Sequence, residues 1–286
     1  MVNLYSYTAI LPIRLIASLL PRPISLFLAE ICGSCAYYLM VKSRRQIANN
    51  ISRAGISLTN TIIRRTFRNY AKYLTDFMYI PRINKNTLDS YFLHYPESSV
   101  IDKVVDGRRG TIIVTGHLGH WELGGALLSI NRYNVTTVAI RKSGTRAFVD
   151  FRERIRKSLN VRTVYVEDNN VSIESLAVLK RGGLIAMLID RNYDASGIPV
   201  TLFNQPFLFP RGPLVLSALT GAVILPASII LDSCNRYNVT LYEPIYVTNS
   251  EDRTLKTSAE KLISILEAEI RKHIEQWYNF QGSAIQ

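Results

Sequence analysis

Gly116-His117-Leu118-Gly119-His120-Trp121-Glu122 follows a β-branched run, Thr111-Ile112-Ile113-Val114-Thr115, and precedes an apolar stretch at residues 126–130. The β-branched run predicts a buried strand, and the apolar stretch predicts the continuation of a helix. Open α/β sheets bind their ligands at the carboxyl ends of their strands. The polar block between strand and helix therefore indicates both the fold class and the place of a site.

His117 and Glu122 are the candidate catalytic residues of this block. On a regular helix, side chains five residues apart point about 140° away from each other. If Gly116 and Gly119 let the chain turn before the helix begins, the imidazole can approach the carboxylate. Glu122 would then hold one ring nitrogen, and the other would act as a general base. The block has no serine or cysteine, so we expect the activated group to be a hydroxyl or amine of the substrate.

Two other interpretations of the block remain open. His117 can cap the helix while Glu122 interacts with the helix dipole, with no chemistry at either residue. His117 and His120 can bind a metal, although His-x-x-His is not the i, i+4 pair of a zinc-binding helix and no third ligand is evident nearby. We expect no metal site.

The composition limits the class of protein. The chain has 286 residues, of which 48% are hydrophobic, a mean hydropathy of +0.08 and a formal net charge of +12. This length suits one large α/β domain with an appended element. Residues 1–100 hold twelve Lys or Arg against four Asp or Glu. A basic, apolar amino-terminal region favours an anionic membrane surface as partner, and no nucleic-acid-binding motif accompanies it, so we expect no nucleic acid partner.

The three cysteines do not form the pattern of a disulfide framework. Cys32 and Cys35 match C-x-x-C, but they lie in an apolar helical run without the strand that precedes a redox motif. They are better explained as two small residues on one helix face. The sequence therefore fits a reducing compartment.

Two apolar segments near the amino terminus, 9–20 and 24–41, are separated by a Pro-Arg-Pro sequence. The first is shorter than the ~20 residues that a spanning helix needs, and the second approaches that length. Lys42, Arg44 and Arg45 follow directly. We expect a helical hairpin in the membrane interface, with these cations on lipid headgroups. One spanning helix and a pair of buried core helices remain open.

Residues 58–79 show the pattern of an amphipathic helix, with apolar residues at alternating steps of four and three. Pro81 ends it. We divide the chain into an N-terminal membrane-associating helical segment, 1–50, and a catalytic domain, 51–286.

From residue 110 onward, short apolar runs alternate with helical stretches. This alternation predicts an α/β fold with a mixed, mostly parallel sheet flanked by helices. The expected strands are 111–115, 135–140, 161–166, 184–189, 223–230 and 239–247. The expected helices lie near 122–131, 145–158, 171–181 and 213–220, with a final helix at 258–277 after a capping box, Thr257-x-x-Glu260.

A second polar block follows the apolar run 184–189. Asp190 comes directly after that run, so we expect it at the same edge of the sheet as His117. Arg191 is the next residue. Arg211 precedes a helix start, where free backbone amides favour anions. These residues extend the candidate site along one edge of the sheet.

The His-x-x-x-x-Glu block resembles that of the late lipid A acyltransferases, a family within the wider glycerolipid acyltransferases, whose block usually ends in Asp. Phe203-Asn204-Gln205-Pro206 resembles the family's Phe-Phe-Gly-x-Pro-like segment, with Asn-Gln where Phe-Gly is usual. Arg141 matches the arginine of the family's Tyr-Arg pair, with isoleucine for the tyrosine. Glu275-Gln276-Trp277 matches part of Pro-Glu-Gln-Trp, with isoleucine for the proline. The similarity covers most of the chain, in the family's order.

The resemblance implies transfer of a fatty acyl chain from acyl carrier protein or CoA to a hydroxyl of a lipid acceptor, with no cofactor. His117 would take the proton of that hydroxyl, and Glu122 would orient the imidazole. Arg141 or helix-start amides would stabilise the oxyanion. Arg191 and Arg211 would hold phosphates, although structural salt bridges explain them equally well. Asp190 would contribute to substrate binding.

The sequence leaves the identity of the acceptor lipid open. A lipid A precursor or a related glycolipid is the first expectation, and lysophospholipids or amino-lipids are the alternatives. An inert membrane-bound scaffold of the same fold is the alternative outside enzymes. We expect the protein at the cytoplasmic face of the bacterial inner membrane, with anionic lipids as partners.

Overall fold

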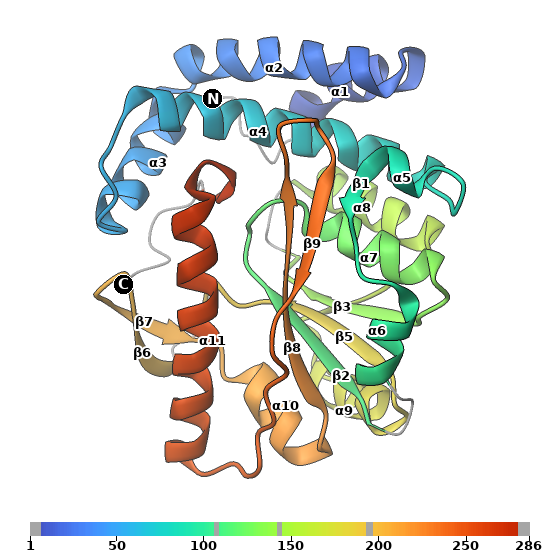
Figure 1. Ribbon diagram of the computed structural model, residues 1–286, viewed down its shortest axis with the longest axis vertical. Coiled ribbons are helices and arrows are strands. Elements are labelled where there is room, and N and C mark those ends of the chain that lie inside the picture. Colours follow the sequence, from blue (N-terminus) through green and yellow to red (C-terminus); the bar gives the residue numbers. More distant parts are fainter. Residues whose placement is uncertain (1–6, 106–108, 142–144, 193–196, 280–286) are drawn as a thin grey trace.

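The computed structural model describes residues 7–105, 109–141, 145–192 and 197–279 (Figure 1). Within these residues, seven strands form one sheet in the order β1-β9-β8-β2-β5-β3-β4. All neighbouring pairs are parallel except β8 and β9. Their bounds are β1 (Phe92–His94), β2 (Thr111–Thr115), β3 (Val135–Ala139), β4 (Arg162–Tyr165), β5 (Leu184–Leu188), β8 (Val223–Leu231) and β9 (Tyr237–Leu241).

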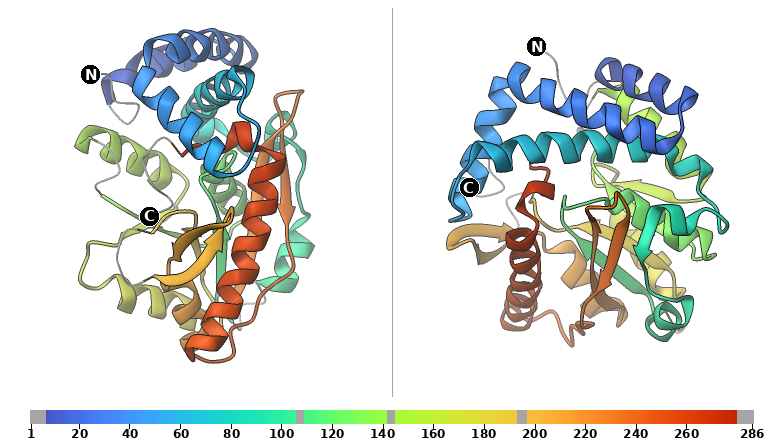
Figure 2. Two further views of the ribbon diagram at one scale, coloured as in Figure 1. Left: turned by 90° about the vertical axis from the view of Figure 1, so that its left-hand side faces the viewer. Right: turned by 45° about the horizontal axis from the view of Figure 1, so that its top comes forward.

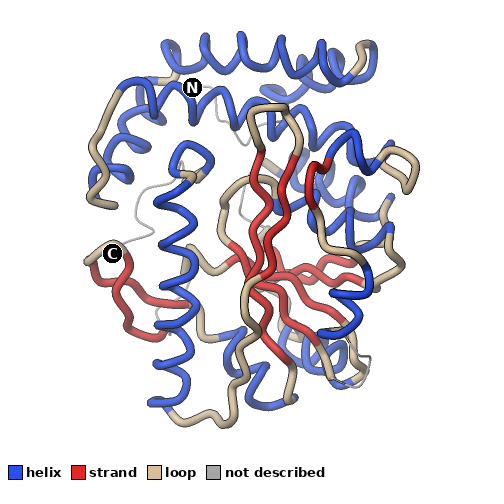
Figure 3. Tube along the Cα trace, in the orientation of Figure 1, coloured by secondary structure: helices blue, strands red, loops and turns tan. Residues whose placement is uncertain are grey.

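Helices cover both faces of this sheet, as Figure 3 shows. Shared hydrophobic clusters place α6, α7 and α8 on one face and α9, α10 and α11 on the other. A sheet covered on both faces needs strands that are apolar throughout, and all nine residues of β8 are buried. The predicted fold class is confirmed. The bounds are α6 (Ser98–Val104), α7 (Trp121–Ile130), α8 (Arg146–Ser158), α9 (Val171–Lys180), α10 (Gly212–Thr220) and α11 (Asp252–Lys272).

The predicted boundaries differ from the observed ones at several places. The expected strand 239–247 is β9, which begins at Tyr237 and ends at Leu241. Helix α11 begins at Asp252, so the proposed capping box at Thr257 and Glu260 lies inside it, and the residue before the first turn is Glu251. The segment after Gly197 contains an antiparallel hairpin that the sequence analysis missed, β6 (Ile198–Leu202) and β7 (Gln205–Phe209). Phe203 and Asn204 form its two-residue turn with φ values of 54° and 58°, as a type I′ turn requires.

Four amino-terminal helices lie along one end of the molecule, α1 (Tyr7–Leu19), α2 (Arg22–Leu39), α3 (Val41–Arg53) and α4 (Asn60–Tyr79). Figure 2 shows α2 and α4 running side by side there. The contact is close, because a Cβ atom on Gly33 would lie 2.7 Å from the carbonyl oxygen of Phe67. Ile47 and Ile51 of α3 belong to the same buried cluster as Ile112 of the sheet. Helices α2 and α3 therefore share a core with the rest of the domain.

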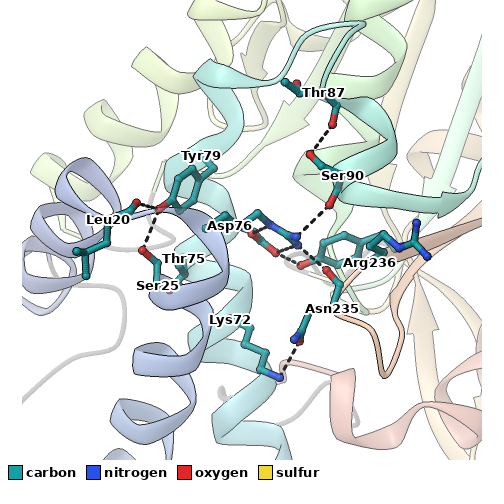
Figure 4. Close-up of polar contacts among 12 residues, drawn as sticks. Leu20, Ser25, Lys72, Thr75, Asp76, Tyr79, Thr87, Ser90, Asn235 and Arg236 are labelled. Atoms are coloured by element: carbon teal, nitrogen blue, oxygen red, sulfur yellow. Dashed lines mark hydrogen bonds and ion pairs between the residues drawn. The ribbon is translucent and has the colours of Figure 1, made fainter.

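A buried ion pair joins α2 to α4 and to the sheet (Figure 4). The Arg22 guanidinium donates to both carboxylate oxygens of Asp76, at 2.6 and 2.9 Å, and the Tyr237 hydroxyl donates to Oδ2 at 2.8 Å. The Asp76 side chain is fully buried. Removing one partner of a buried pair leaves an uncompensated charge, so this contact ties the amino-terminal helices firmly to the domain.

The outer faces of α1 and α2 are apolar and exposed. Large apolar side chains on these faces are Leu11, Leu15, Leu19, Ile24, Phe27, Ile31, Tyr38 and Leu39. By length and composition, none of the described helices can cross a bilayer by itself, whereas α2 and α3 together pass that test with a bend of 92° between them. Helices α1 and α2 thus pack against the domain on one side and expose apolar side chains on the other. The expected membrane element stays a prediction.

Candidate active site

Strand register brings His117 and Asp190 together. Strands β2 and β5 are neighbours and parallel, with Thr115 opposite Leu188, and the Ile189 amide donates to the Thr115 carbonyl at 2.9 Å. Two residues after Thr115 the polypeptide reaches His117, and two residues after Leu188 it reaches Asp190. The two side chains therefore meet at the carboxyl edge of the sheet, where α/β folds bind ligands.

The His117 imidazole is held from one side. Its Nδ1 lies 2.7 Å from Asp190 Oδ1, and the indole Nε1 of Trp277 donates to Asp190 Oδ2 at 3.0 Å. The Asp190 side chain is fully buried, whereas that of His117 is 16% exposed. With Nδ1–H donated to the carboxylate, the neutral ring carries its lone pair on Nε2. A neutral imidazole in this tautomer is a general base.

The charges around this pair keep it in that state. Burial, followed by the nearby Arg191 guanidinium, lowers the pKa of His117 from 6.5, and this outweighs the opposing influence of Asp190. Burial alone would raise the pKa of Asp190, but His117, Arg191 and Trp277 together hold it well below its usual range. At neutral pH the pair is therefore a neutral imidazole on an ionised carboxylate.

Glu122 does not hold His117 on Nδ1, contrary to the predicted pairing. Its two carboxylate oxygens accept hydrogen bonds from Arg156 Nη2 at 2.5 Å and Arg156 Nε at 3.0 Å. Burial would raise the pKa of Glu122, and Arg156 outweighs it, so the pKa is lowered. The reason is strand order. Residue 190 reaches Nδ1 from the neighbouring strand β5, while α8 presents Arg156 to the first turn of α7.

The chain before α7 needs glycine. Gly119 has φ +60°, and a Cβ atom there would collide with the carbonyl oxygen of Ile229. Its amide donates to the Gln276 carbonyl at 3.0 Å, and the next amide, that of His120, donates to the Ile229 carbonyl at 2.8 Å. The predicted turn before the helix is therefore confirmed, and its contacts hold the block against β8 and the carboxyl-terminal segment.

His120 caps α7. Its Nδ1 accepts from the Leu123 amide at 3.3 Å, and the side chain is fully buried against Tyr73 and Tyr237. Burial lowers the pKa of His120 to about 4. Among the described residues, no cluster of three or more His, Cys, Asp or Glu side chains is arranged to hold a metal ion.

A cavity of about 580 Å³ adjoins these residues and is lined by His117, Trp121 and Glu122 among others. Because successive strand residues point to opposite faces, the lining residues divide into two groups, one on each face of the sheet, and we name the parts of the cavity beside them the inner branch and the outer branch. The inner branch lies on the α7 face, and the outer branch lies on the face of α9 and α10. Residues of the inner branch are Ile113, Gly124, Gly125, Leu127, Leu128, Val135, Thr137, Val161 and Ala186. Residues of the outer branch are Val138, Leu176, Met187, Val215, Leu216 and Leu219.

The outer branch reaches the surface, since its lining residues Val166 and Leu219 are 47% and 57% exposed. The inner branch is enclosed by residues of the buried clusters, such as Leu128 and Val135. Both branches are predominantly apolar. A cavity of this shape suits a hydrocarbon chain better than a polar metabolite.

The three candidate arginines occupy different positions. Arg191 is buried, lines the cavity and donates through Nη2 to the Tyr278 carbonyl at 2.9 Å. Arg211 lines the cavity and is partly exposed, with Nη2 2.8 Å from Asp252. Arg141 is not among the lining residues. Its guanidinium contacts Asp168 at 2.6 Å and lies over the Tyr165 ring.

Sequence reasoning missed Arg152 and Arg156, which line the cavity from α8. Four residues apart, they share one face of the helix, and a solvated face is the default interpretation of such a pair. Arg156 is buried and Arg152 is half-buried. The only sequence signal for this was the nearby apolar residues Phe148 and Ile155 at helical spacing. Trp277 was noted for its resemblance to a family segment, but its bond to Asp190 was not foreseen.

Comparisons with known proteins identify the family of this chain. Residues 4–282 match the family of bacterial lipid A biosynthesis acyltransferases. The phosphatidylinositol mannoside acyltransferase of Mycolicibacterium smegmatis is 26% identical over 247 residues, covering 83% of this chain and 77% of that protein. The enzyme of the same name from Mycobacterium tuberculosis is 23% identical over 198 residues, covering 64% of this chain and 58% of that protein. The chain belongs to the bacterial lipid A biosynthesis acyltransferase family and is an acyltransferase.

Proposed function

We propose that this protein transfers a fatty acyl chain from a thioester, of acyl carrier protein or CoA, to a hydroxyl of a membrane glycolipid. One observation carries the proposal. A neutral imidazole, His117, is oriented by a buried carboxylate, Asp190, at the wall of an apolar cavity. A base beside a space for hydrocarbon is what direct acyl transfer requires.

The reaction follows from the orientation of His117. Nε2 removes the proton of the acceptor hydroxyl as the oxygen attacks the thioester carbonyl carbon. The tetrahedral intermediate then collapses, the carbon–sulfur bond breaks, and the imidazolium returns its proton to the departing sulfur. Asp190 acts as a positioning residue, since it holds Nδ1–H and stabilises the imidazolium. The acyl group passes directly to the acceptor, with no acyl-enzyme.

The two branches of the cavity suit two substrates. The acyl chain of the thioester fits the enclosed inner branch, where it is shielded from water by α7. The acceptor, which must arrive from a bilayer, fits the outer branch, whose rim at Val166 and Leu219 is exposed and apolar. The thioester carbonyl and the acceptor hydroxyl then meet beside His117, at the junction of the two branches.

Glu122 has a supporting role in this proposal. Its bidentate pair with Arg156 fixes the first turn of α7 against α8, and both residues line the cavity. The pair therefore shapes the wall beside the base.

An acceptor bearing phosphate agrees with Arg191 and Arg211 in the lining, because arginine matches phosphate geometry bidentately. The relatives are acyltransferases for a phosphatidylinositol mannoside, and the family is that of lipid A biosynthesis, so a phosphorylated glycolipid is the acceptor that we propose.

The exposed apolar faces of α1 and α2 would rest on the bilayer, with Arg44 and Arg45 near anionic headgroups. Each such cation adds about 1 kcal/mol of binding. We propose the cytoplasmic face of the bacterial inner membrane as the location, because the thioester donors are cytoplasmic.

The purified full chain, mixed with palmitoyl-CoA or palmitoyl-acyl carrier protein and acceptor-containing vesicles, tests the function. The acceptors are an under-acylated lipid A precursor, a phosphatidylinositol mannoside and a lysophospholipid. We expect mass spectrometry to show a gain of one palmitoyl group on one of the two glycolipids. Acylation of only the lysophospholipid would change the substrate class, and no acylation of any acceptor would favour an inert scaffold.

A further inference from the structure

Two consecutive glycines interrupt the buried face of α7. Gly124 and Gly125 lie in the interior of the helix, where each glycine costs roughly 1 kcal/mol relative to alanine. Their neighbours Leu123 and Ala126 are completely buried, whereas both glycines retain accessible surface because they border the cavity. The absent side chains thus create space at a cost in helix stability.

The two glycines differ in the room that a side chain would find. A Cβ atom on Gly124 would lie 2.6 Å from Ile229 Cδ1, so Ile229 would have to move. A Cβ atom on Gly125 would have Val161 Cγ2 as its nearest neighbour, at 4.0 Å, an ordinary van der Waals distance. A longer side chain at position 125 would therefore extend into the cavity without first displacing its walls.

Gly125 lies partway along the inner branch. It is three residues beyond Glu122 on α7, about 4.5 Å along the helix axis. On the opposite wall, Thr115 and Ile113 point to the same face of β2 and lie ~6.6 Å apart along it. Leu128 stands beyond Gly125 on α7 and belongs to the buried cluster that encloses this branch. A chain entering beside His117 must pass Gly125 to reach that end.

We propose that Gly125 determines the length of the acyl chain that this enzyme accepts, because the missing side chain keeps the far part of the inner branch open. This inference rests on the proposed function, in which the inner branch holds the acyl chain. It predicts that a larger residue at position 125 shortens the preferred chain, and that the same change elsewhere in the cavity does not.

Gly212 is the matched control. It lines the same cavity from the first turn of α10, on the other face of the sheet, and a Cβ atom there would have no heavy atom within 4 Å. Gly125→Leu and Gly212→Leu thus add the same atoms to the inner and outer branches. Gly125→Ala is the conservative variant, which favours the helix and adds one methyl group.

The first measurement is binding, which needs no catalysis. A fluorescent fatty acid is bound to the full-length protein and to each variant, and is displaced by laurate, myristate, palmitate or stearate. For each protein we compare the affinity for stearate with the affinity for laurate, as a ratio. Each methylene excluded from an apolar site weakens binding roughly fourfold. We expect Gly125→Leu to lower the ratio on the order of tenfold or more, Gly125→Ala to lower it less, and Gly212→Leu to leave it unchanged.

The same series of CoA thioesters in the transfer assay separates this inference from the proposed function. A shifted binding ratio without any acyl transfer, even by the unsubstituted protein, would leave the chain-length site standing and reject the reaction. If Gly125→Leu transfers acyl chains with the same length preference as the unsubstituted protein, the chain-length site is rejected and the reaction is left standing. A shift in Gly212→Leu instead would place the acyl chain in the outer branch and overturn the inference. If thermal denaturation shows that Gly125→Leu is not folded, the stearate-to-laurate ratio of Gly125→Ala tests the inference in its place.

Discussion

Two buried carboxylates lie at the same edge of the sheet, and they differ in their partners. Asp190 binds His117, whose pKa is lowered from 6.5, whereas Glu122 binds Arg156, whose pKa is raised further from 12.5 against the desolvating effect of burial. The imidazole of the first pair can accept and release a proton, whereas the guanidinium of the second pair stays charged. The comparison indicates that the partner, not the carboxylate, decides whether a buried pair can exchange a proton.

The largest expected effect is on the reactive pair. His117→Ala removes the base, and we expect the rate of acyl transfer to fall roughly 10²–10⁴-fold while the protein stays folded. His94→Ala is the control, because His94 is an exposed histidine at the end of β1. Transfer at near the original rate by a folded His117→Ala protein would remove this residue from the mechanism.

The structural pair should respond in the opposite way. Glu122→Ala leaves the Arg156 guanidinium buried without its carboxylate, so we expect a loss of about 3–5 kcal/mol in the free energy of unfolding, measured in denaturant. The double variant Glu122→Leu/Arg156→Met removes both charges.

The double variant should recover most of the lost stability, because replacing a buried pair with apolar residues is often neutral. Full stability in Glu122→Ala together with loss of transfer would instead assign Glu122 to the chemistry, as the sequence alone predicts.

The smallest expected effect is on the pH dependence of kcat/KM. His117 must be neutral to accept a proton, so the rate should be constant near neutral pH and fall as the pH drops through the pKa of His117, which lies below 6.5. Asp190 raises that pKa, so Asp190→Asn should move the acidic limb to still lower pH while also lowering the plateau. An acidic limb above pH 6.5, or an upward shift in Asp190→Asn, would contradict the assignment of the pair.

The sequence by itself determined the fold class and most of the elements. Alternating apolar runs and helical stretches are local patterns. The strand at Thr111–Thr115 was predicted at its observed position, and the helix expected at 58–79 begins two residues later, at Asn60. The placement of His117 and Asp190 at the carboxyl edge also followed, because both residues come directly after apolar strand runs. The short β1 escaped because its partner strand, β9, lies far along the chain. The β6–β7 hairpin escaped because its turn residues, Phe203 and Asn204, lack the glycine that usually marks a type I′ turn.

Only the tertiary structure decided which residues of that edge touch. Strand β5 lies between β2 and β3, so the neighbour of the strand before His117 is not the next strand in the sequence. That order places Asp190 beside His117 and leaves Glu122 to Arg156. The same holds for Arg22 and Asp76, which lie 54 residues apart and form a buried pair. Strand order and buried pairing are settled by the packing of all the layers together, a long-range free energy that no local sequence pattern contains.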